Sequence, residues 1–492
     1  MKTSRIYILL VLLLMGVVRM QAQVTEPVEI LPSPTLIVYH MDQWSDNQII
    51  LNAVESGVGL YAVIIDEEGN IIDYELWHSY TNTCYFLTES KFFRMSDGGL
   101  CFYYVKGPDH PTVYKVSISE DFELTTFEFA DAFPFPEEIT HDDWWNFAWL
   151  PNDDGSTFVS GVYIEGNHSV QMMVRYNENG EITHQWSEIT SRATTSLLPP
   201  AKGASGCRLV MEDPDDVNSE CVIFDDSLNV VDIKHSIYNQ SVGIYRPHYE
   251  YFAVHPETDM VYLLSDVSFP AFNGNPQIRS DIYMSQFNPD FTQTKFKLGP
   301  YTLDEYDQIA LCEAIDFQGE NIYMCGYMNT MWGGNQSETD NFYVAMLDGN
   351  LDIIGEIYYH NETRMVVPYS ILVLPSGGCL VSTAGRERRT GEQQHAIFKI
   401  SKETLLCIDE AHEASFAVAI AYPNPGKDVL NIRTALQNAR LEVFDLNGRL
   451  MHSQKITENV TTIDAAAWPS GVYVWKVISN GKDAESGKWI KK

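Results

Sequence analysis

Basic residues are scarce in this chain. Its 492 residues include 32 Lys and Arg against 67 Asp and Glu, so the formal net charge is −35. So acidic a surface repels nucleic acid and anionic lipid, because it has no excess cations to replace their counterions. The imbalance is uneven: residues 24–420 hold 19 basic and 60 acidic side chains, whereas residues 421–492 hold 10 and 7. This difference predicts two units with different roles.

Long hydrophobic runs are also missing, apart from one near the N-terminus. Lys2 and Arg5 precede the apolar residues 6–18, and a short polar stretch with Ala22 follows. A run of 13 residues is shorter than the roughly 20 that a membrane-spanning helix needs. The pattern predicts a secretory signal peptide at residues 1–23, cleaved after Ala22 or Gln23. We therefore expect no integral membrane segment after its removal.

The eight cysteines form no metal-binding pattern. No Cys-x-x-Cys occurs and no Cys is adjacent to a His, so the sequence predicts neither a metal site nor a cofactor. An even number of cysteines in an exported protein permits disulfides. The spacing allows a bridge between Cys207 and Cys221 and another between Cys312 and Cys325. Free thiols buried in the core are the alternative.

One β-strand pattern recurs seven times between residues 24 and 410. Each copy has an apolar strand, a turn rich in Asp, Asn, Glu or Gly, and a second apolar strand, with two further short strands upstream. The first turn residue of each copy is Asp66, Ser119, Asn177, Asp225, Asn288, Asp348 or Ser401. Four strands per unit of about 40–60 residues are typical of a β-propeller. The prediction is an all-β chain with a seven-bladed β-propeller at 24–410; a β-helix, whose repeats are shorter, is the competing repeat fold.

The long, varied loops of this propeller fall on one face, and we expect ligand binding there. Acidic and aromatic side chains suit sugars, because rings stack on apolar sugar faces and carboxylates accept hydroxyl protons. A small group of arginines suits a carboxylate or phosphate. The alternative is structural: Trp residues fill blade junctions and the arginines pair with nearby acids. The candidate ligand-binding residues are Asp142, Asp143, Trp144, Trp145, Arg246, His248, Trp332, Arg386 and Arg388.

After a linker at residues 411–419, residues 420–492 predict a small β-sandwich. Its motifs are Tyr422-Pro423-Asn424-Pro425, a turn at Gly448, the pair Gly471 and Tyr473, and Lys488 and Lys491 near the end. In this order they resemble the type A C-terminal sorting domain of the type IX secretion system of Bacteroidetes. The resemblance implies the type IX machinery as partner, export through the periplasm, and release or attachment at the cell surface. A carbohydrate-binding sandwich is the alternative.

Familiar catalytic motifs are missing as well. The sequence has no G-x-S-x-G, no P-loop and no H-E-x-x-H. Residues 153–158 resemble the Asp-box of sialidases once, but in a turn where those boxes do not lie. We therefore expect a non-catalytic protein that binds a glycan, peptide or surface protein. A propeller-fold glycan hydrolase or lyase and a structural surface scaffold are the alternatives.

Overall fold

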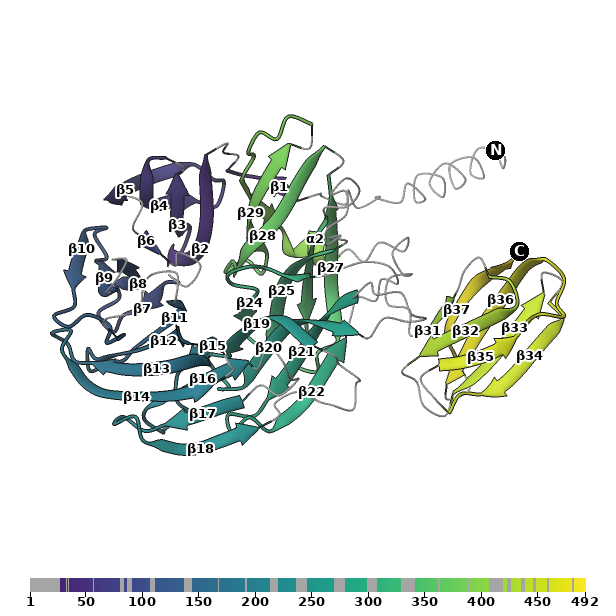
Figure 1. Ribbon diagram of the computed structural model, residues 1–492. Helices are drawn as coiled ribbons and strands as arrows, with labels where there is room; N and C mark the ends of the chain where they lie inside the picture. Colours follow the sequence, from purple (N-terminus) through teal and green to yellow (C-terminus); the bar gives the residue numbers. More distant parts are fainter. Residues whose placement is uncertain are drawn as a thin grey trace, which may run out of the picture. The chain divides into compact units, whose positions relative to one another are not determined.

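A computed structural model shows two units, Met1–Asp409 and Glu410–Lys492 (Figure 1). It describes residues 27–492 apart from a set of short segments, most of them between strands. These omitted segments are 32, 34, 56, 80–83, 86–90, 107–110, 137–143, 167, 191–192, 213–219, 236–245, 270–278, 299–307, 329–340, 362, 388, 407–418, 423–425, 435–438, 446–447, 458–459 and 480–481.

The described residues of the first unit form seven antiparallel sheets. The first sheet holds β2 (Leu36–Ser45), β3 (Gln48–Glu55), β4 (Gly59–Asp66) and β5 (Ile71–Ser79). The second holds β6 (Cys84–Tyr85), β7 (Phe93–Arg94), β8 (Leu100–Lys106), β9 (Thr112–Ile118) and β10 (Leu124–Glu128). The third holds β11 (Trp144–Pro151), β12 (Thr157–Glu165), β13 (His168–Tyr176) and β14 (Ile182–Thr190).

The remaining sheets repeat this order. The fourth holds β15 (Ala193–Leu198), β16 (Cys207–Glu212), β17 (Glu220–Phe224) and β18 (Val230–His235). The fifth holds β19 (Arg246–Val254), β20 (Val261–Phe269), β21 (Arg279–Phe287) and β22 (Gln293–Leu298). The sixth holds β23 (Gln308–Ile309), β24 (Ile315–Gln318), β25 (Asn321–Met328), β26 (Asn341–Leu347) and β27 (Ile353–His360). The seventh holds β28 (Arg364–Val373), β29 (Cys379–Glu387), β30 (Ala396–Ile400) and β1 (Val28–Glu29).

Neighbouring sheets pack through their first strands and through apolar clusters. Contacts join β11 to β15, β15 to β19, β19 to β23, β25 to β28, and β28 back to β2. One cluster of buried side chains spans the second and third sheets, and another spans the first and seventh. Burial on both faces explains why the strands are apolar at successive positions. The predicted propeller fold is confirmed (Figure 1).

The turn between the third and fourth strands has a recurring structure. The side chain of its first residue accepts backbone N–H bonds from the third and fifth, as Asp66 Oδ1 does from Glu68 and Asn70 at 3.0 and 2.8 Å. The fourth residue takes a positive φ, which usually favours Gly. Four other side chains occupy this strained position, and the residues found there are Gly69, Phe122, Gly180, Leu228, Phe291 and Leu351. The turn residues predicted from the sequence therefore lie where one hairpin geometry repeats.

Leu351 tests whether burial outweighs backbone strain in this turn. Its φ is 64° and its exposed fraction is 1 %. We expect Leu351→Ala to lower the free energy of unfolding by about 2–5 kcal/mol, because a buried leucine is lost while the strain stays. Leu351→Gly should be at least as stable as Leu351→Ala, since Gly relieves the strain. In strand β26 the order should reverse, with Val344→Ala more stable than Val344→Gly. Urea denaturation of the four variants measures this, and the same order at both positions would contradict it.

The seventh sheet differs from its prediction. Residues 396–409 were expected to form a complete hairpin, but β30 is followed by the short helix α2 (Lys402–Leu406). Ser401 favours the helix because its Oγ accepts the backbone N–H of Thr404 at 3.1 Å. The fourth strand comes instead from the N-terminal side of the chain: in β1, Val28 pairs with Lys399 and Glu29 with Phe398. The ring is therefore closed by joining the two ends of the unit.

A side-chain pair strengthens this closure. The guanidinium of Arg364 donates to both carboxylate oxygens of Glu29, at 3.2 and 2.8 Å. The Arg364 side chain is only 8 % exposed, and its guanidinium lies 5.6 Å from the ring centre of Phe398. Two-point pairing of a largely buried arginine is among the stronger polar contacts in proteins. β1 is thus held by side chains as well as by backbone.

The second unit consists of two sheets around one core. One sheet holds β31 (Ala419–Tyr422), β32 (Val429–Thr434) and β35 (Val460–Asp464). The other holds β34 (Leu450–Lys455), β33 (Arg440–Asp445), β36 (Gly471–Ser479) and β37 (Lys482–Lys491). Both sheets contribute to one buried cluster that includes Ile432, Val443 and Trp489. This arrangement is the predicted small β-sandwich.

Candidate functional site

The predicted ligand-binding residues are spread over several sheets. Trp144 and Trp145 are the first residues of strand β11 and do not lie in a connecting loop as expected; their backbones pair with Tyr163 and Val162 of β12. Arg246 and His248 belong to β19, in the fifth sheet.

The remaining candidates are mostly beyond description. Asp142, Asp143, Trp332 and Arg388 lie outside the described residues. Arg386 is an exposed residue of β29 in the seventh sheet, where its Nη2 lies 3.6 Å from Met365 Sδ. The described candidates therefore come from three different sheets, and their grouping into one site stays a prediction.

Neither predicted disulfide is formed. Cys207 and Cys221 lie on the adjacent strands β16 and β17, but Cys207 pairs with Phe224 and Cys221 with Val210, so the two thiols are out of register. Both are free and buried, and burial raises the pKa of each. Cys325 is a buried thiol without a disulfide, so the bridge from it to Cys312 is also not made. The expectation of bridges was wrong because neighbouring strands were assumed to place the cysteines opposite each other.

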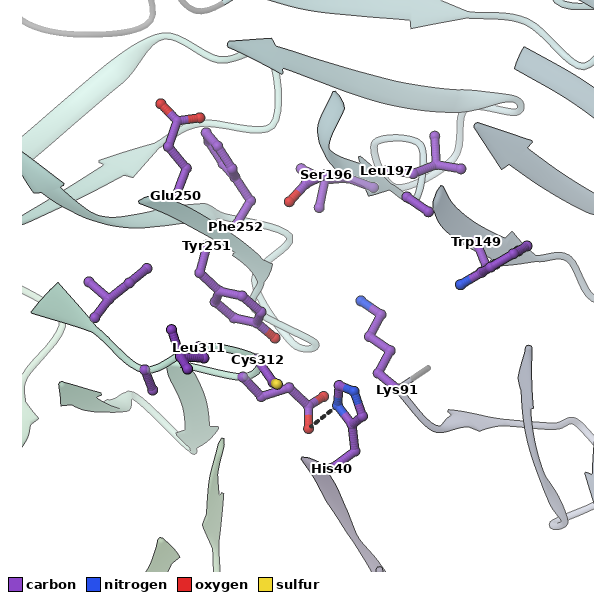
Figure 2. A pocket seen from close by; sticks show the side chains of 15 residues that line it. His40, Lys91, Trp149, Ser196, Leu197, Glu250, Tyr251, Phe252, Leu311 and Cys312 are labelled. Carbon is purple, nitrogen blue, oxygen red and sulfur yellow. Dashed lines mark ion pairs between the residues drawn. The ribbon is translucent and has the colours of Figure 1, made fainter. Parts of the chain in front are cut away.

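A cavity of about 110 Å³ lies where the first strands of the sheets meet (Figure 2). Six sheets contribute to its wall or to the segments just beside their first strands. Apolar groups such as Leu197, Leu198 and Ile309 alternate with polar ones such as His40, Lys91 and Glu313. Its volume is below the roughly 300 Å³ at which pockets for drug-sized ligands begin. The cavity therefore suits a small molecule or the end group of a larger one.

Polar groups converge on this cavity from different sheets. Figure 2 shows the ammonium of Lys91, the hydroxyl of Tyr251 and the indole nitrogen of Trp149 directed toward the same space. Trp149 is held rigidly, because its ring stacks on Tyr103 at 5.8 Å and on Phe147 at 5.5 Å between centroids. Only the edge of the indole is thus available to a ligand.

Carboxyl groups cluster beside the same cavity. Glu313 Oε2 lies 3.3 Å from Nδ1 of His40, whose side chain is 2 % exposed. Asp42, two residues along β2 from His40, lies with Oδ1 3.6 Å from the guanidinium of Arg94. Asp316 in β24 accepts backbone N–H bonds from Phe317 at 2.8 Å and Val373 at 2.6 Å, and so connects the sixth and seventh sheets.

The environment of this cluster favours neutral carboxyl groups. Burial raises the pKa of Asp42 to about 6, with the charge of Glu313 adding to the rise and Arg94 opposing it. Burial also raises the pKa of Asp316 to about 7, with Glu313 and Asp42 contributing and its two backbone hydrogen bonds opposing. Such groups exchange protons near neutral pH, which is the property required of a general acid.

Asp42 should make stability depend on pH. Its pKa of about 6 lies above its ordinary 3.8, so the folded protein holds this proton more tightly than the unfolded chain. The stability that it contributes is therefore full below pH 4 and is lost as the pH rises through 6. We expect Asp42→Asn to reduce the fall in unfolding free energy between pH 4 and 7 by up to about 3 kcal/mol. Urea denaturation at a series of pH values measures it, with the exposed Asp46→Asn as control; an unchanged pH profile in Asp42→Asn would contradict it.

Sequence reasoning missed this cavity, although one sign was visible. His40 and Asp42 are polar residues two apart in an otherwise apolar strand, so both were candidates for an inward-facing position. Lys91 and Glu313 lie outside the named strands, in connecting segments that carry no periodic pattern. Their approach to one another depends on the closing of the ring.

In the second unit, several sorting-motif residues have defined structural roles. Tyr422 ends β31, and Pro423, Asn424 and Pro425 lie outside the described residues. Gly448 completes a turn with a φ of 77° and donates its N–H to the carbonyl oxygen of Asp445 at 2.9 Å.

The last two strands carry the other motif residues. Gly471 begins β36, and the hydroxyl of the nearby Tyr473 donates to the carbonyl oxygen of Pro469 at 2.6 Å. Lys488 and Lys491 lie in β37. The side chain of Lys491 is 6 % exposed; its ammonium donates to the carbonyl oxygen of Lys427 and lies 3.5 Å from Asp428 Oδ1. Lys491 thereby fixes the end of the chain to the entry of the unit.

Comparison with known proteins places the second unit in a family. Residues 420–492 match the family model of the secretion system C-terminal sorting domain, which confirms the predicted resemblance. These residues are a type IX secretion sorting domain, and the chain is an exported propeller protein. A search of curated proteins finds no match to the chain. No helix of the described residues is both long enough and apolar enough to cross a membrane.

Solved structures similar to this chain share little sequence with it. The polysaccharide lyase Uly1 is 10% identical, with a TM-score of 0.41 over 74% of this chain and 90% of that one. The periplasmic gluconolactonase PpgL of Pseudomonas aeruginosa is 11% identical, with a TM-score of 0.39 over 75% and 96%. The α-L-arabinofuranosidase Arb93A of Fusarium graminearum is 10% identical, with a TM-score of 0.39 over 78% and 99%. Likeness at this level does not transfer an activity.

Proposed function

We propose that this protein is delivered to the cell surface or the medium, where it binds a glycan, peptide or surface protein without chemical turnover. The ligand enters the central cavity from the side of the long connecting loops. The observation that carries this proposal is the cavity itself: aromatic, cationic and anionic groups from separate sheets converge on one space of about 110 Å³. Rigid strands hold these groups, as a binding site requires.

Binding is tested with the mature chain isolated from culture. Glycan and peptide arrays and capture of surface proteins give the ligand class, and incubation with each bound ligand shows whether it is consumed. Saturable binding with the ligand recovered intact supports the proposal. Binding followed by turnover would replace it with an enzyme, and no binding to any of the three classes would leave the structural scaffold.

A glycan hydrolase or lyase is the second candidate, and one observation favours it. Asp42 and Asp316 have raised pKa values beside Glu313, so protonated and ionised carboxyl groups coexist near neutral pH. Glycoside hydrolysis uses such a pair as acid and as base or nucleophile. Both oxygens of Asp316 already accept backbone N–H bonds, which favours a structural role for that residue. Release of reducing ends or unsaturated sugars by the wild type, abolished in Asp42→Asn, would establish the enzyme.

A further inference from the structure

Trp149 presents a buried hydrogen-bond donor at the central cavity. The residue is 2 % exposed, and its Nε1 has no hydrogen-bond partner among the described residues. A buried N–H without an acceptor costs about 1–3 kcal/mol, so such groups are rare unless something else satisfies them. Figure 2 shows this nitrogen directed into the cavity. An oxygen of a ligand would provide the missing acceptor.

The other polar groups define what that ligand has to offer. Lys91 donates hydrogen bonds and the carboxylate of Glu313 accepts them, and both line the cavity. The hydroxyl group both donates and accepts, so a molecule with several hydroxyls satisfies donors and acceptors at once. The apolar wall formed by residues such as Leu197 and Leu198 suits the C–H face of a sugar ring.

The charges at the site disfavour ionised ligands. A carboxylate would approach Glu313, whose charge already contributes to the raised pKa values of Asp42 and Asp316. It would also enter a unit in which 60 acidic residues face 19 basic ones over residues 24–420. An ammonium would approach Lys91. A neutral ligand meets neither repulsion.

The size of the cavity limits the ligand to one ring. A water molecule needs roughly 10–15 Å³ of such a volume, so about 110 Å³ accommodates on the order of nine water-sized groups. A monosaccharide is of similar size, whereas two linked sugars are larger. An oligosaccharide could therefore place only its terminal residue inside.

We infer that the central cavity binds a single neutral sugar ring, free or at the end of a glycan, with Trp149 and Lys91 donating to its oxygens. This rests on the proposed binding function and specifies its ligand class. Trp149 and Lys91 are binding residues in this assignment. Glu313 accepts a hydroxyl proton from the ring while it remains beside His40.

Calorimetric titration of the full mature chain tests the inference. The probes are glucose, galactose, mannose, xylose and N-acetylglucosamine, with glucuronate and glucosamine as charged counterparts of glucose. We expect at least one neutral sugar to bind more tightly than either charged one. Trp149→Phe keeps the aromatic ring but loses the N–H, and should weaken binding about 2- to 12-fold. Lys91→Met should weaken it about tenfold or more, since hydrogen bonds from charged groups are stronger.

Matched controls separate binding from folding. Trp186→Phe changes a tryptophan that packs on Phe224, away from the cavity, and Lys202→Met removes an exposed lysine. Both should bind sugar like the wild type, and thermal unfolding confirms that each variant is folded. Tighter binding of glucuronate, or unchanged binding in folded Trp149→Phe and Lys91→Met, would overturn the inference. If arrays detect a ligand but no neutral monosaccharide binds, this inference fails and the proposed function stands; if arrays detect nothing, both fail.

Discussion

Deletion of residues 420–492 is expected to leave the propeller in the periplasm. The deleted segment is the sorting domain, and Met1–Asp409 forms a compact unit without it. The shortened chain should therefore still fold and still cross the inner membrane, but it lacks the part that the type IX machinery recognises. Essentially all of the protein should move from the surface and medium to the periplasmic fraction. Immunoblots of fractionated cells measure this distribution.

A smaller change in the same domain provides a graded version of this experiment. Lys491→Met removes the buried ammonium that bonds to the carbonyl oxygen of Lys427, whereas Lys476→Met alters another lysine of the same sheet. We expect export to fall in the first variant and to persist in the second. Continued appearance of the 420–492 deletion outside intact cells would show that another signal directs export.

Arg364→Leu is expected to destabilise the propeller by about 3–5 kcal/mol. This is the range found when one partner of a buried ion pair is removed. The change leaves the Glu29 carboxylate without its two-point partner, at the strand that closes the ring. Urea denaturation should show the loss as a lower transition midpoint.

Two further variants identify the origin of that loss. Arg386→Leu changes an exposed arginine of the same sheet and should shift the unfolding free energy by no more than about 0.5 kcal/mol. The double variant Glu29→Leu with Arg364→Leu should regain part of the stability, because no unpaired charge remains. If Arg364→Leu is as stable as Arg386→Leu, the pair contributes little and backbone pairing of β1 suffices.

The repeating hairpins could be predicted because each turn has its own local signal. Asp66, Asn177, Asp225 and Asp348 stand at the first turn position, and their side chains accept backbone N–H bonds within the turn itself. No distant part of the chain is needed for this interaction. The sorting domain was recognisable for a similar reason, since its motifs occur in a fixed order within a short segment.

The closing strand could not be predicted in this way. β1 has only two residues, Val28 and Glu29, and so short a strand has no visible alternation. Its pairing partner lies more than 300 residues away in the sequence. The hairpin expected after β30 was wrong because the edge is occupied by β1 and Ser401 begins a helix there instead.

The central cavity was beyond reach for a related reason. Lys91, Trp149 and Glu313 belong to the second, third and sixth sheets, and nothing in the sequence indicates that they share a space. Trp149 resembles any other buried aromatic residue until its Nε1 is seen without a partner. Loop-based reasoning instead favoured residues such as Trp144 and Arg246, which begin strands.

Closure of the ring by β1 gives the unit a test of chain completeness. Glu29 leaves the ribosome first and Arg364 follows 335 residues later, so the closing contact cannot form until almost the whole unit has been made. Bringing ends so far apart together costs about 5 kcal/mol in chain entropy, and this cost grows only slowly with length. A chain that ends early has no partner for β1 and leaves the edges of its first and last sheets open. Incomplete copies would thus expose strand edges that proteases recognise, and only full-length molecules, which also carry the sorting domain, would reach the outside as closed rings.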